Sequence, residues 1–77
     1  MNQSDEIKMV SHMLFQQYGA LVLDTKQVAS ILGIAEITLK QNRGNGIGLP
    51  YVKVGKSVKY KIIDIANFLF KNTMKVF

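Results

Sequence analysis

Apolar side chains recur at helical spacing near the start of the chain, on one stripe made of Ile7, Val10, Met13, Leu14 and Tyr18. Ser4 stands where an N-cap is expected, and Asp5 and Glu6 follow in the first turn, where the helix dipole favours negative charge. Gly19 comes directly after the stripe, as the residue that ends many helices does. The pattern predicts an amphipathic helix over residues 4–18.

A short apolar run and a second helix are expected next. The run "ALVL", residues 20–23, is typical of a short buried strand. In "DTKQVASILG", residues 24–33, Asp24 can cap a helix, and Gln27 three residues later completes a capping box. Gly33 ends this helix, and its buried face is formed by Val28, Ala29, Ile31 and Leu32.

Helical spacing resumes in "IAEITLKQNRGNG", residues 34–46, and predicts a further short helix over residues 35–42. A tight turn that contains Gly33 joins this helix to the preceding one, which is the helix-turn-helix pattern. The segment "GNGIGLP", residues 44–50, holds three of the six glycines and the only proline, so a loop is expected there.

Residues 51–62 alternate valines and tyrosines with lysines on both sides of Gly55, which predicts a β-hairpin. A turn of Gly55 and Lys56 alone would give each face a mixture of apolar and charged side chains. A loop that also includes Ser57 would separate them, with one face made of Val52, Val54, Val58, Tyr60 and Ile62 and the other of Tyr51, Lys53, Lys59 and Lys61. Because a shift of one residue decides between a core-facing sheet and a mixed one, we expect the three-residue loop.

The expected register pairs Val54 with Val58 and places Lys53 directly opposite Lys59. Like charges across a strand pair are destabilising, by roughly a few tenths of a kcal/mol where water screens them. A polyanion lying across this face would turn the repulsion into attraction. Exposed lysines also protect sheet edges from aggregation, which is the alternative explanation of the pair.

The segment "IIDIANFLFKN", residues 62–72, returns to helical spacing, with Asp64 near the start of the helix. The expected fold is therefore mostly α with a small β-hairpin. Residues 1–19 are expected as an additional helix for packing or oligomerisation, and residues 20–77 as the main domain. The end of the chain is more apolar than a monomer needs, which favours self-association through the N-terminal helix or through Phe70, Met74, Val76 and Phe77.

The composition fits one small cytoplasmic domain. At 77 residues a single domain is expected, and a hydrophobic content of 48% is enough for a folded core. The lack of cysteine excludes disulfides and thiolate zinc sites and favours a reducing compartment. No apolar run approaches the roughly 20 residues that span a bilayer, and "MNQSDEIK" lacks the basic start and apolar stretch of a signal peptide.

The net charge of +5 is distributed unevenly. Residues 1–34 hold two lysines against three acidic residues, whereas residues 35–77 hold eight basic residues against Glu36 and Asp64. Between Lys40 and Ile63 there are six basic residues and no acidic one. This one-sided segment indicates a polyanion partner, either nucleic acid or an anionic surface, and a solvated lysine face is the alternative.

Patterns of catalysis and metal binding are not found in the sequence. His12 is the only histidine, and one histidine without cysteines makes no metal site. Gly44, Gly46 and Gly48 lack the lysine and serine or threonine that follow the glycines of a phosphate-binding loop. We expect a protein that is not an enzyme and that uses no cofactor, metal or small-molecule ligand.

Four motifs follow one another along the middle of the chain: A-x-x-L-G-I (Ala29 to Ile34), T-L-x-x-x-R (Thr38 to Arg43), G-x-G-L-P-Y-x-K-V-G (Gly46 to Gly55) and Y-K-I-x-D-I (Tyr60 to Ile65). With these motifs the segment from Leu23 to Leu69, 47 of the 77 residues, resembles a group of small winged helix-turn-helix proteins. This group comprises the excisionase and AlpA-type proteins and is related to the DNA-binding domains of MerR regulators.

The resemblance implies a double-stranded DNA-binding protein that regulates transcription in a phage, plasmid or genomic island and associates with the nucleoid when bound. The helix over residues 35–42 would enter the major groove, and the wing over residues 51–62 would lie against the backbone. A homodimer or cooperative oligomer is expected, with a recombinase or RNA polymerase as a further partner. A recombination directionality factor that bends DNA beside an integrase is the alternative within the group, and a protein-interaction module is the alternative of another class.

The expected contacts of the second helix come from its outer side and its end: Glu36, Ile37, Lys40, Gln41 and Arg43. Gln41 suits adenine, Lys40 suits guanine or a phosphate, and Ile37 suits a thymine methyl group. Ile37 and Arg43 have equally good alternatives, since Ile37 also suits a core or protein contact and Arg43 suits the dipole at the helix end. Glu36 suits a tuning or capping role better than a contact with cytosine. The alternative for Lys40 and Gln41 is ordinary solvated helix surface.

The expected backbone contacts of the wing are Tyr51, Lys53, Lys56, Lys59 and Lys61, and phosphate contacts of this kind position a protein without specifying sequence. A packing role for Tyr51 is the alternative. Thr25 and Lys26, at the start of the first helix of the pair, are weaker candidates for a phosphate. Where the group often has serine, a polar residue and a bulky apolar residue, this chain has Ala35, Ile37 and Asn42. These departures concern the cap and the base contacts of the second helix.

Overall fold

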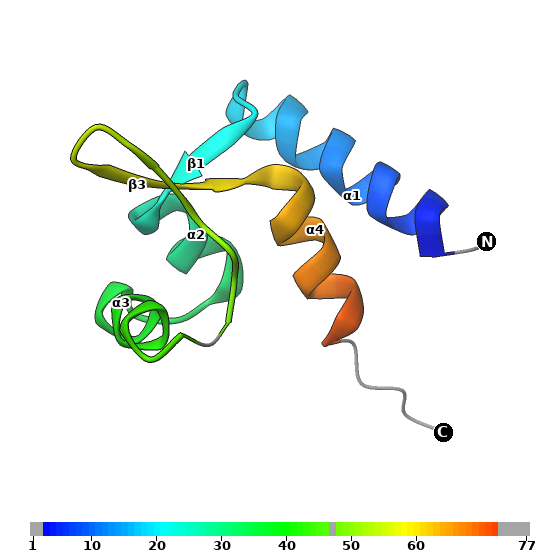
Figure 1. Cartoon of the computed structure of the whole chain (residues 1–77). Coiled ribbons are helices and arrows are strands. Elements are labelled where there is room, and N and C mark those ends of the chain that lie inside the picture. The colour runs from blue at the N-terminus through cyan, green and yellow to red at the C-terminus, as the bar shows by residue number, and fades with distance from the viewer. Residues whose placement is uncertain (1–2, 47, 73–77) are drawn as a thin grey trace.

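The computed structural model describes residues 3–46 and 48–72, which form a small, mostly helical protein with a three-stranded antiparallel sheet (Figure 1). In chain order the elements are α1 (Gln3–Tyr18), β1 (Val22–Asp24), α2 (Thr25–Leu32), α3 (Glu36–Gly44), β2 (Val52–Val54), β3 (Ser57–Lys61) and α4 (Ile62–Lys71). The expected helices and hairpin are all present. Within the described ranges, no helix combines the length and the apolar character needed to cross a membrane.

The N-terminal helix α1 is amphipathic, as its spacing predicts. Leu14 is buried in the core, and Val10 and Tyr18 pack against it. Gly19 ends the helix with a φ of 69°, and its amide donates a hydrogen bond to the carbonyl of Phe15 at 2.7 Å. The helix begins at Gln3, one residue before Ser4, the expected cap. Met13, expected on the apolar stripe, is 59% exposed.

The capping box of α2 is confirmed. The Asp24 carboxylate accepts a hydrogen bond from the Gln27 amide at 2.8 Å, and the Gln27 side chain accepts one from the Asp24 amide at 3.0 Å. Gly33 closes the helix in the left-handed region with a φ of 70°. Val28 and Ala29 are buried, so the two ends and the inner face of α2 all follow the sequence signals.

Helix α3 follows the tight turn at Gly33 and extends two residues beyond the predicted end at Asn42, to Gly44. Ala35 occupies the N-cap with extended backbone and has no side-chain group that could cap the helix. Its carbonyl accepts hydrogen bonds from the amides of Thr38 and Leu39. Leu39 is 3% exposed and attaches the helix to the core.

The sheet has the strand order β1-β3-β2, so β3 is the central strand and β1 and β2 are the two edge strands. Leu23 of β1 stands opposite Tyr60 of β3, and both are almost fully buried. The expectation that residues 20–23 form a buried strand holds only for Leu23, because Leu21 and Val22 are 69% and 37% exposed. Sequence reasoning assigned this strand no partner, and the partner is the hairpin.

The register expected for the hairpin is wrong. Val54 pairs with Ser57, Lys53 with Val58 and Val52 with Lys59, so the turn consists of Gly55 and Lys56 alone. Gly55 has a φ of 64°, and no described residue other than glycine has a positive φ. A two-residue turn with positive φ only at its first position is type II′, for which glycine followed by another residue is the usual sequence.

Neighbouring residues of a strand point to opposite faces, so the shorter turn redistributes the lysines. Lys53 shares a face with Val58 and Tyr60, whereas Lys59 and Lys61 lie on the other face. Lys59 stands between Val52 of β2 and Asp24 of β1 and has no lysine opposite it. The predicted Lys53–Lys59 repulsion is therefore absent, and it cannot support a polyanion partner.

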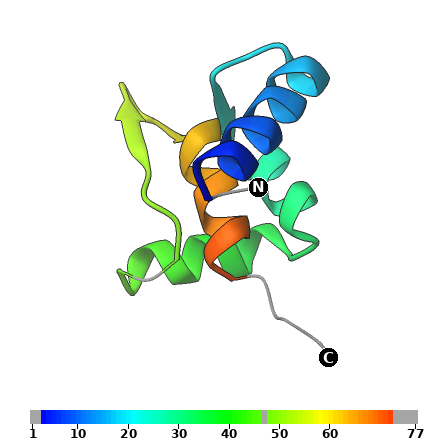
Figure 2. The ribbon, with the colours of Figure 1, turned by 90° about the vertical axis from the view of Figure 1, so that its right-hand side faces the viewer.

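Helix α4 begins directly after β3 and carries Asp64 in its first turn, as predicted. Ile62, Ile65 and Ala66 are buried on its inner face. Helix α1 packs along α4, and Leu14 of α1 belongs to the same core cluster as the buried residues of α2, α3 and the sheet. Figures 1 and 2 show α1 and α3 at opposite ends of the molecule, with α4 between them.

Candidate nucleic-acid interface

The outward surface of α3 is defined by the buried side chain on its inner side. Each residue of an α-helix turns by about 100°, so the two positions that lie two residues before and after Leu39 point about 160° away from it. These positions are Ile37 and Gln41, and both are exposed. They lie one turn apart on the ridge that faces away from the core.

Glu36 and Lys40 are also exposed and lie beside this ridge, on the side where Arg43 projects. The structure thus brings together on one solvent-facing surface the four residues predicted from the outer side of the helix, Glu36, Ile37, Lys40 and Gln41. We call these four residues the α3 face. Ile37 is 61% exposed, so the alternative of a core role is wrong for this residue.

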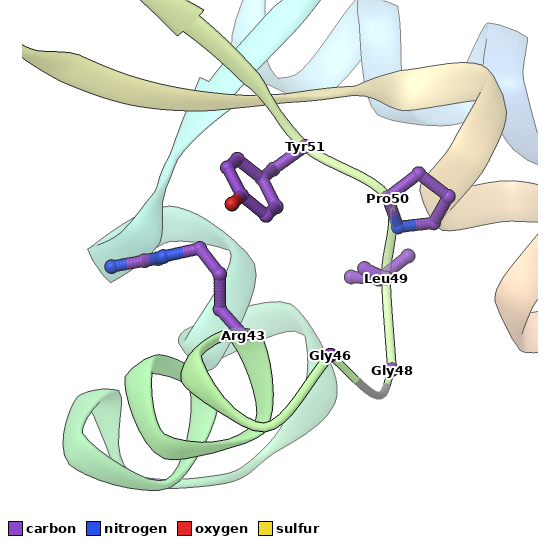
Figure 3. A pocket seen from close by; sticks show the side chains of 6 residues that line it. All are labelled: Arg43, Gly46, Gly48, Leu49, Pro50 and Tyr51. Carbon is purple, nitrogen blue, oxygen red and sulfur yellow. The ribbon is translucent and has the colours of Figure 1, made fainter.

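Arg43 connects the last turn of α3 to the hairpin. Its Nη1 donates a hydrogen bond to the hydroxyl of Tyr60 at 2.8 Å, and its guanidinium carbon lies 5.6 Å from the centroid of the Tyr51 ring. The rings of Tyr51 and Tyr60 are tilted by 58° with centroids 6.5 Å apart. Figure 3 shows Arg43 reaching from the helix toward Tyr51, which precedes β2. Helix and hairpin are therefore joined by a hydrogen bond and a cation–π contact.

The sequence does not indicate this cluster of Arg43, Tyr51 and Tyr60 as a unit. It suggests a phosphate or the helix dipole for Arg43 and only the core face of the hairpin for Tyr60. The two residues are 17 positions apart in the chain and belong to different elements, so no spacing pattern links them. The alternative of a packing role for Tyr51 agrees with the position of its ring beside Arg43 and Tyr60, although the residue is 45% exposed.

A pocket of about 400 Å³ opens between the end of α3 and the loop that leads to β2, and it is lined by Arg43, Gly46, Gly48, Leu49, Pro50 and Tyr51 (Figure 3). Leu49 is buried and anchors the loop that leads from α3 to β2. Gly46 and Gly48 have φ values of 71° and 88°, which side chains rarely tolerate. The glycines of this segment thus allow the loop to turn back toward the sheet.

The wing lysines lie in different surroundings. Lys53 and Lys56 are exposed, the first on the hairpin face that holds Tyr60 and the second in the turn. Lys59 is half-buried between Asp24 and Val52. Lys61 lies 3.7 Å from a carboxylate oxygen of Asp64, with its side chain 53% exposed. Of the four lysines, Lys53 and Lys56 are therefore the most open to an external anion.

Thr25 and Lys26 stand in the first turn of α2, with Thr25 half-buried and Lys26 exposed. The Asp24 carboxylate occupies this helix start and already accepts the hydrogen bond of the Gln27 amide. A phosphate approaching here would meet a negative charge before it met the helix dipole. The geometry favours the α3 face and the hairpin over this third location.

Helix α3 and the hairpin turn lie on the same side of the molecule. In Figure 1 both are on the left, whereas α1 and α4 occupy the right. Helix α3 and the hairpin carry all six basic residues between Lys40 and Ile63: Lys40, Arg43, Lys53, Lys56, Lys59 and Lys61. An elongated anionic partner on this side of the molecule could reach both the helix and the basic hairpin.

Known proteins provide no further guide to this surface. A scan against models of protein families gives no match to the chain, and a search of curated proteins finds no significant similarity. In the described part of the chain, no three histidine or acidic side chains are grouped closely enough to hold a metal ion. The case for a function therefore depends on the geometry of the α3 face and the hairpin.

Proposed function

We propose that the protein binds double-stranded DNA in a sequence-specific way as a winged helix-turn-helix domain. In this proposal α2 and α3 are the helix pair, α3 is the recognition helix, and β2 and β3 form the wing. The observation that carries the proposal is the exposed α3 face, which is fixed to a lysine-bearing hairpin by the bond between Arg43 and Tyr60. The major groove, about 12 Å wide, admits one α-helix.

The residues of the α3 face have different roles in this proposal. Gln41 can donate to and accept from the major-groove edge of adenine, and Lys40 can donate to guanine or to a phosphate. Glu36 lies in the first turn of α3, where its charge suits the helix dipole, and it limits the approach of phosphates to this end. In this proposal the protein is a small transcriptional regulator from a mobile genetic element. The resemblance of the sequence to the excisionase and AlpA-type group supports this assignment.

Selection of bound sequences from a random duplex pool, at a stated salt concentration, tests the proposal. We expect a short enriched motif, because the α3 face offers side chains that distinguish base pairs. Lys40→Ala and Gln41→Ala should each relax the preference at one or two positions, with a cost of about 1–3 kcal/mol on the preferred site. Lys8→Ala, on α1 at the opposite end of the molecule, is the matched control.

The wing makes a separate prediction about salt dependence. Lys53→Ala and Lys56→Ala should each weaken binding to every duplex and lower the slope of log K against log salt by about one ion. Lys61→Ala should lower this slope less, because the Asp64 carboxylate, 3.7 Å from the Lys61 ammonium, already offsets part of the lysine charge. Titrations at four or more salt concentrations give the slopes. Equal slopes for the wild type and both Lys53 and Lys56 variants would remove the wing from the interface.

A further inference from the structure

An isoleucine occupies one of the two most outward positions of the α3 face. Ile37 is 61% exposed, and its neighbours on this surface, Glu36, Lys40 and Gln41, are polar or charged. On the free protein this side chain therefore leaves apolar area in water, which is unfavourable by roughly 25 cal/mol per Å². The energetic cost is recovered where a partner covers Ile37 with an apolar group.

The direction of Ile37 decides what could cover it. Because Leu39 is buried and lies two residues away, Ile37 points almost directly away from the core. A helix that enters a groove with this side foremost places Ile37 and Gln41 deepest, with Lys40 and Glu36 toward one wall. Ile37 would then meet the edge of a base, since phosphates lie at the rim of the groove.

The major groove offers one apolar group on its base edges, the C5-methyl group of thymine. The other groups there are hydrogen-bond donors and acceptors, and a branched aliphatic side chain placed against them removes their water without replacing the hydrogen bonds. An isoleucine at the deepest point thus favours a pyrimidine that carries a methyl group at C5 and disfavours other bases.

We infer that Ile37 determines specificity by packing against the C5-methyl group of a thymine in the major groove. This inference depends on the proposed function, because α3 must lie in the groove. The neighbouring Gln41 lies one turn further along the ridge, about 6 Å away along the helix axis, which is within about two base-pair steps. Ile37 and Gln41 would together select A·T pairs within about two base-pair steps of each other. 5-Methylcytosine presents the same methyl group and would be accepted in place of thymine.

The test uses the sequence selected from the random pool, prepared as synthetic duplexes in which each thymine in turn is replaced by deoxyuridine. Uracil keeps the hydrogen-bonding pattern of thymine and lacks only the methyl group. At one or two positions we expect the wild-type protein to bind the uracil duplex about fourfold more weakly, the value for one buried methyl-sized group. At such a position 5-methylcytosine should be preferred over cytosine by a similar factor.

Variants of the protein connect the methyl effect to Ile37. Ile37→Ala should bind thymine and uracil duplexes equally at those positions, and Ile37→Val should keep part of the difference. Ile63→Ala removes another exposed isoleucine, 45% exposed, from α4, away from the α3 face, and should behave as the wild type. Since Ile37 is exposed, these variants should keep the thermal unfolding midpoint, which is measured alongside.

The outcomes separate this inference from the proposed function. If a motif is selected but no position distinguishes thymine from uracil, the inference is wrong and DNA recognition by α3 stands. The inference is also wrong if the Ile37→Ala variant keeps the wild-type difference, because another group then contacts the methyl. If the pool yields no motif at all, the proposed function fails, and this assignment fails with it.

Discussion

At the scale of single residues, Arg43 and Tyr60 are the pair that sets the position of the α3 face. The Arg43 guanidinium donates a hydrogen bond to the hydroxyl of Tyr60, whose ring is fully buried. It also lies over the ring of Tyr51, which is half-exposed. Such a contact restrains the last turn of α3 against the hairpin, because the buried Tyr60 cannot move without disturbing the core. A charged donor on a neutral acceptor contributes about 1.5–3 kcal/mol when it is sheltered from water.

Tyr60→Phe removes the acceptor hydroxyl and leaves the ring in place. We expect the free energy of unfolding to fall by about 1–2 kcal/mol, since Arg43 is only half-buried and regains water. Urea unfolding followed by circular dichroism gives this value. Tyr51→Phe keeps the ring under Arg43 and loses a hydroxyl on an exposed residue, so it should change stability by less than about 0.5 kcal/mol. Equal losses for the two variants would contradict the assigned role of the Tyr60 hydroxyl.

At the scale of elements, the helices and the sheet differ in how far their sequences determine them. Helix ends depend on neighbouring residues, and so the box of Asp24 and Gln27 and the left-handed Gly33 are readable from the sequence. The hairpin register depends on a distant segment: β1 pairs with β3 and places Leu23 against Tyr60. The separation of apolar from charged residues therefore predicts register poorly for a strand, such as β3, that pairs with a neighbour on each side.

The α3 face also combines features that the local sequence determines with features that depend on distant residues. Its exposed residues follow from helical spacing and the single buried Leu39, and sequence reasoning placed them correctly. The attachment of Arg43 to Tyr60 joins residues 17 positions apart in two elements, and no local pattern contains this information. The prediction that Lys53, Lys59 and Lys61 share one face was wrong, because it depended on the register.

Helix α3 lacks a side-chain cap, and this leads to a prediction about its stability. Ala35 already has the extended backbone of an N-cap, with φ of −73° and ψ of 148°, so a hydroxyl there could accept from a first-turn amide. Ala35→Thr should be more stable than Ala35→Val by about 1 kcal/mol, because the two side chains have the same shape and differ in the hydroxyl. Thermal unfolding of both variants measures the difference. Equal midpoints would show that the first-turn amides of α3 are already satisfied.

At the scale of the whole molecule, α3 and α1 lie at opposite ends (Figures 1 and 2). One domain of this size reaches only a few base pairs, so we expect a second copy in the proposed complex with DNA. Helix α1 leaves Met9 and Met13 exposed by 47% and 59%, one turn apart on its outer side. Methionines in such positions suit adaptable protein contacts. The other predicted association segment includes Met74, Val76 and Phe77, which lie outside the described residues.

We therefore predict that two copies associate through α1 while α3 remains open to DNA. Replacing Met9 and Met13 together by Gln should weaken association at least tenfold, because the apolar contact is lost without a change of net charge. Replacing both by Leu keeps the apolar area and should preserve the dimer. Sedimentation equilibrium of the free protein and of its complex with a selected duplex measures both masses. The assignment to α1 fails if the Gln and Leu pairs associate equally, and a wild type that stays monomeric on its preferred site would mean that α3 and the hairpin achieve specificity alone.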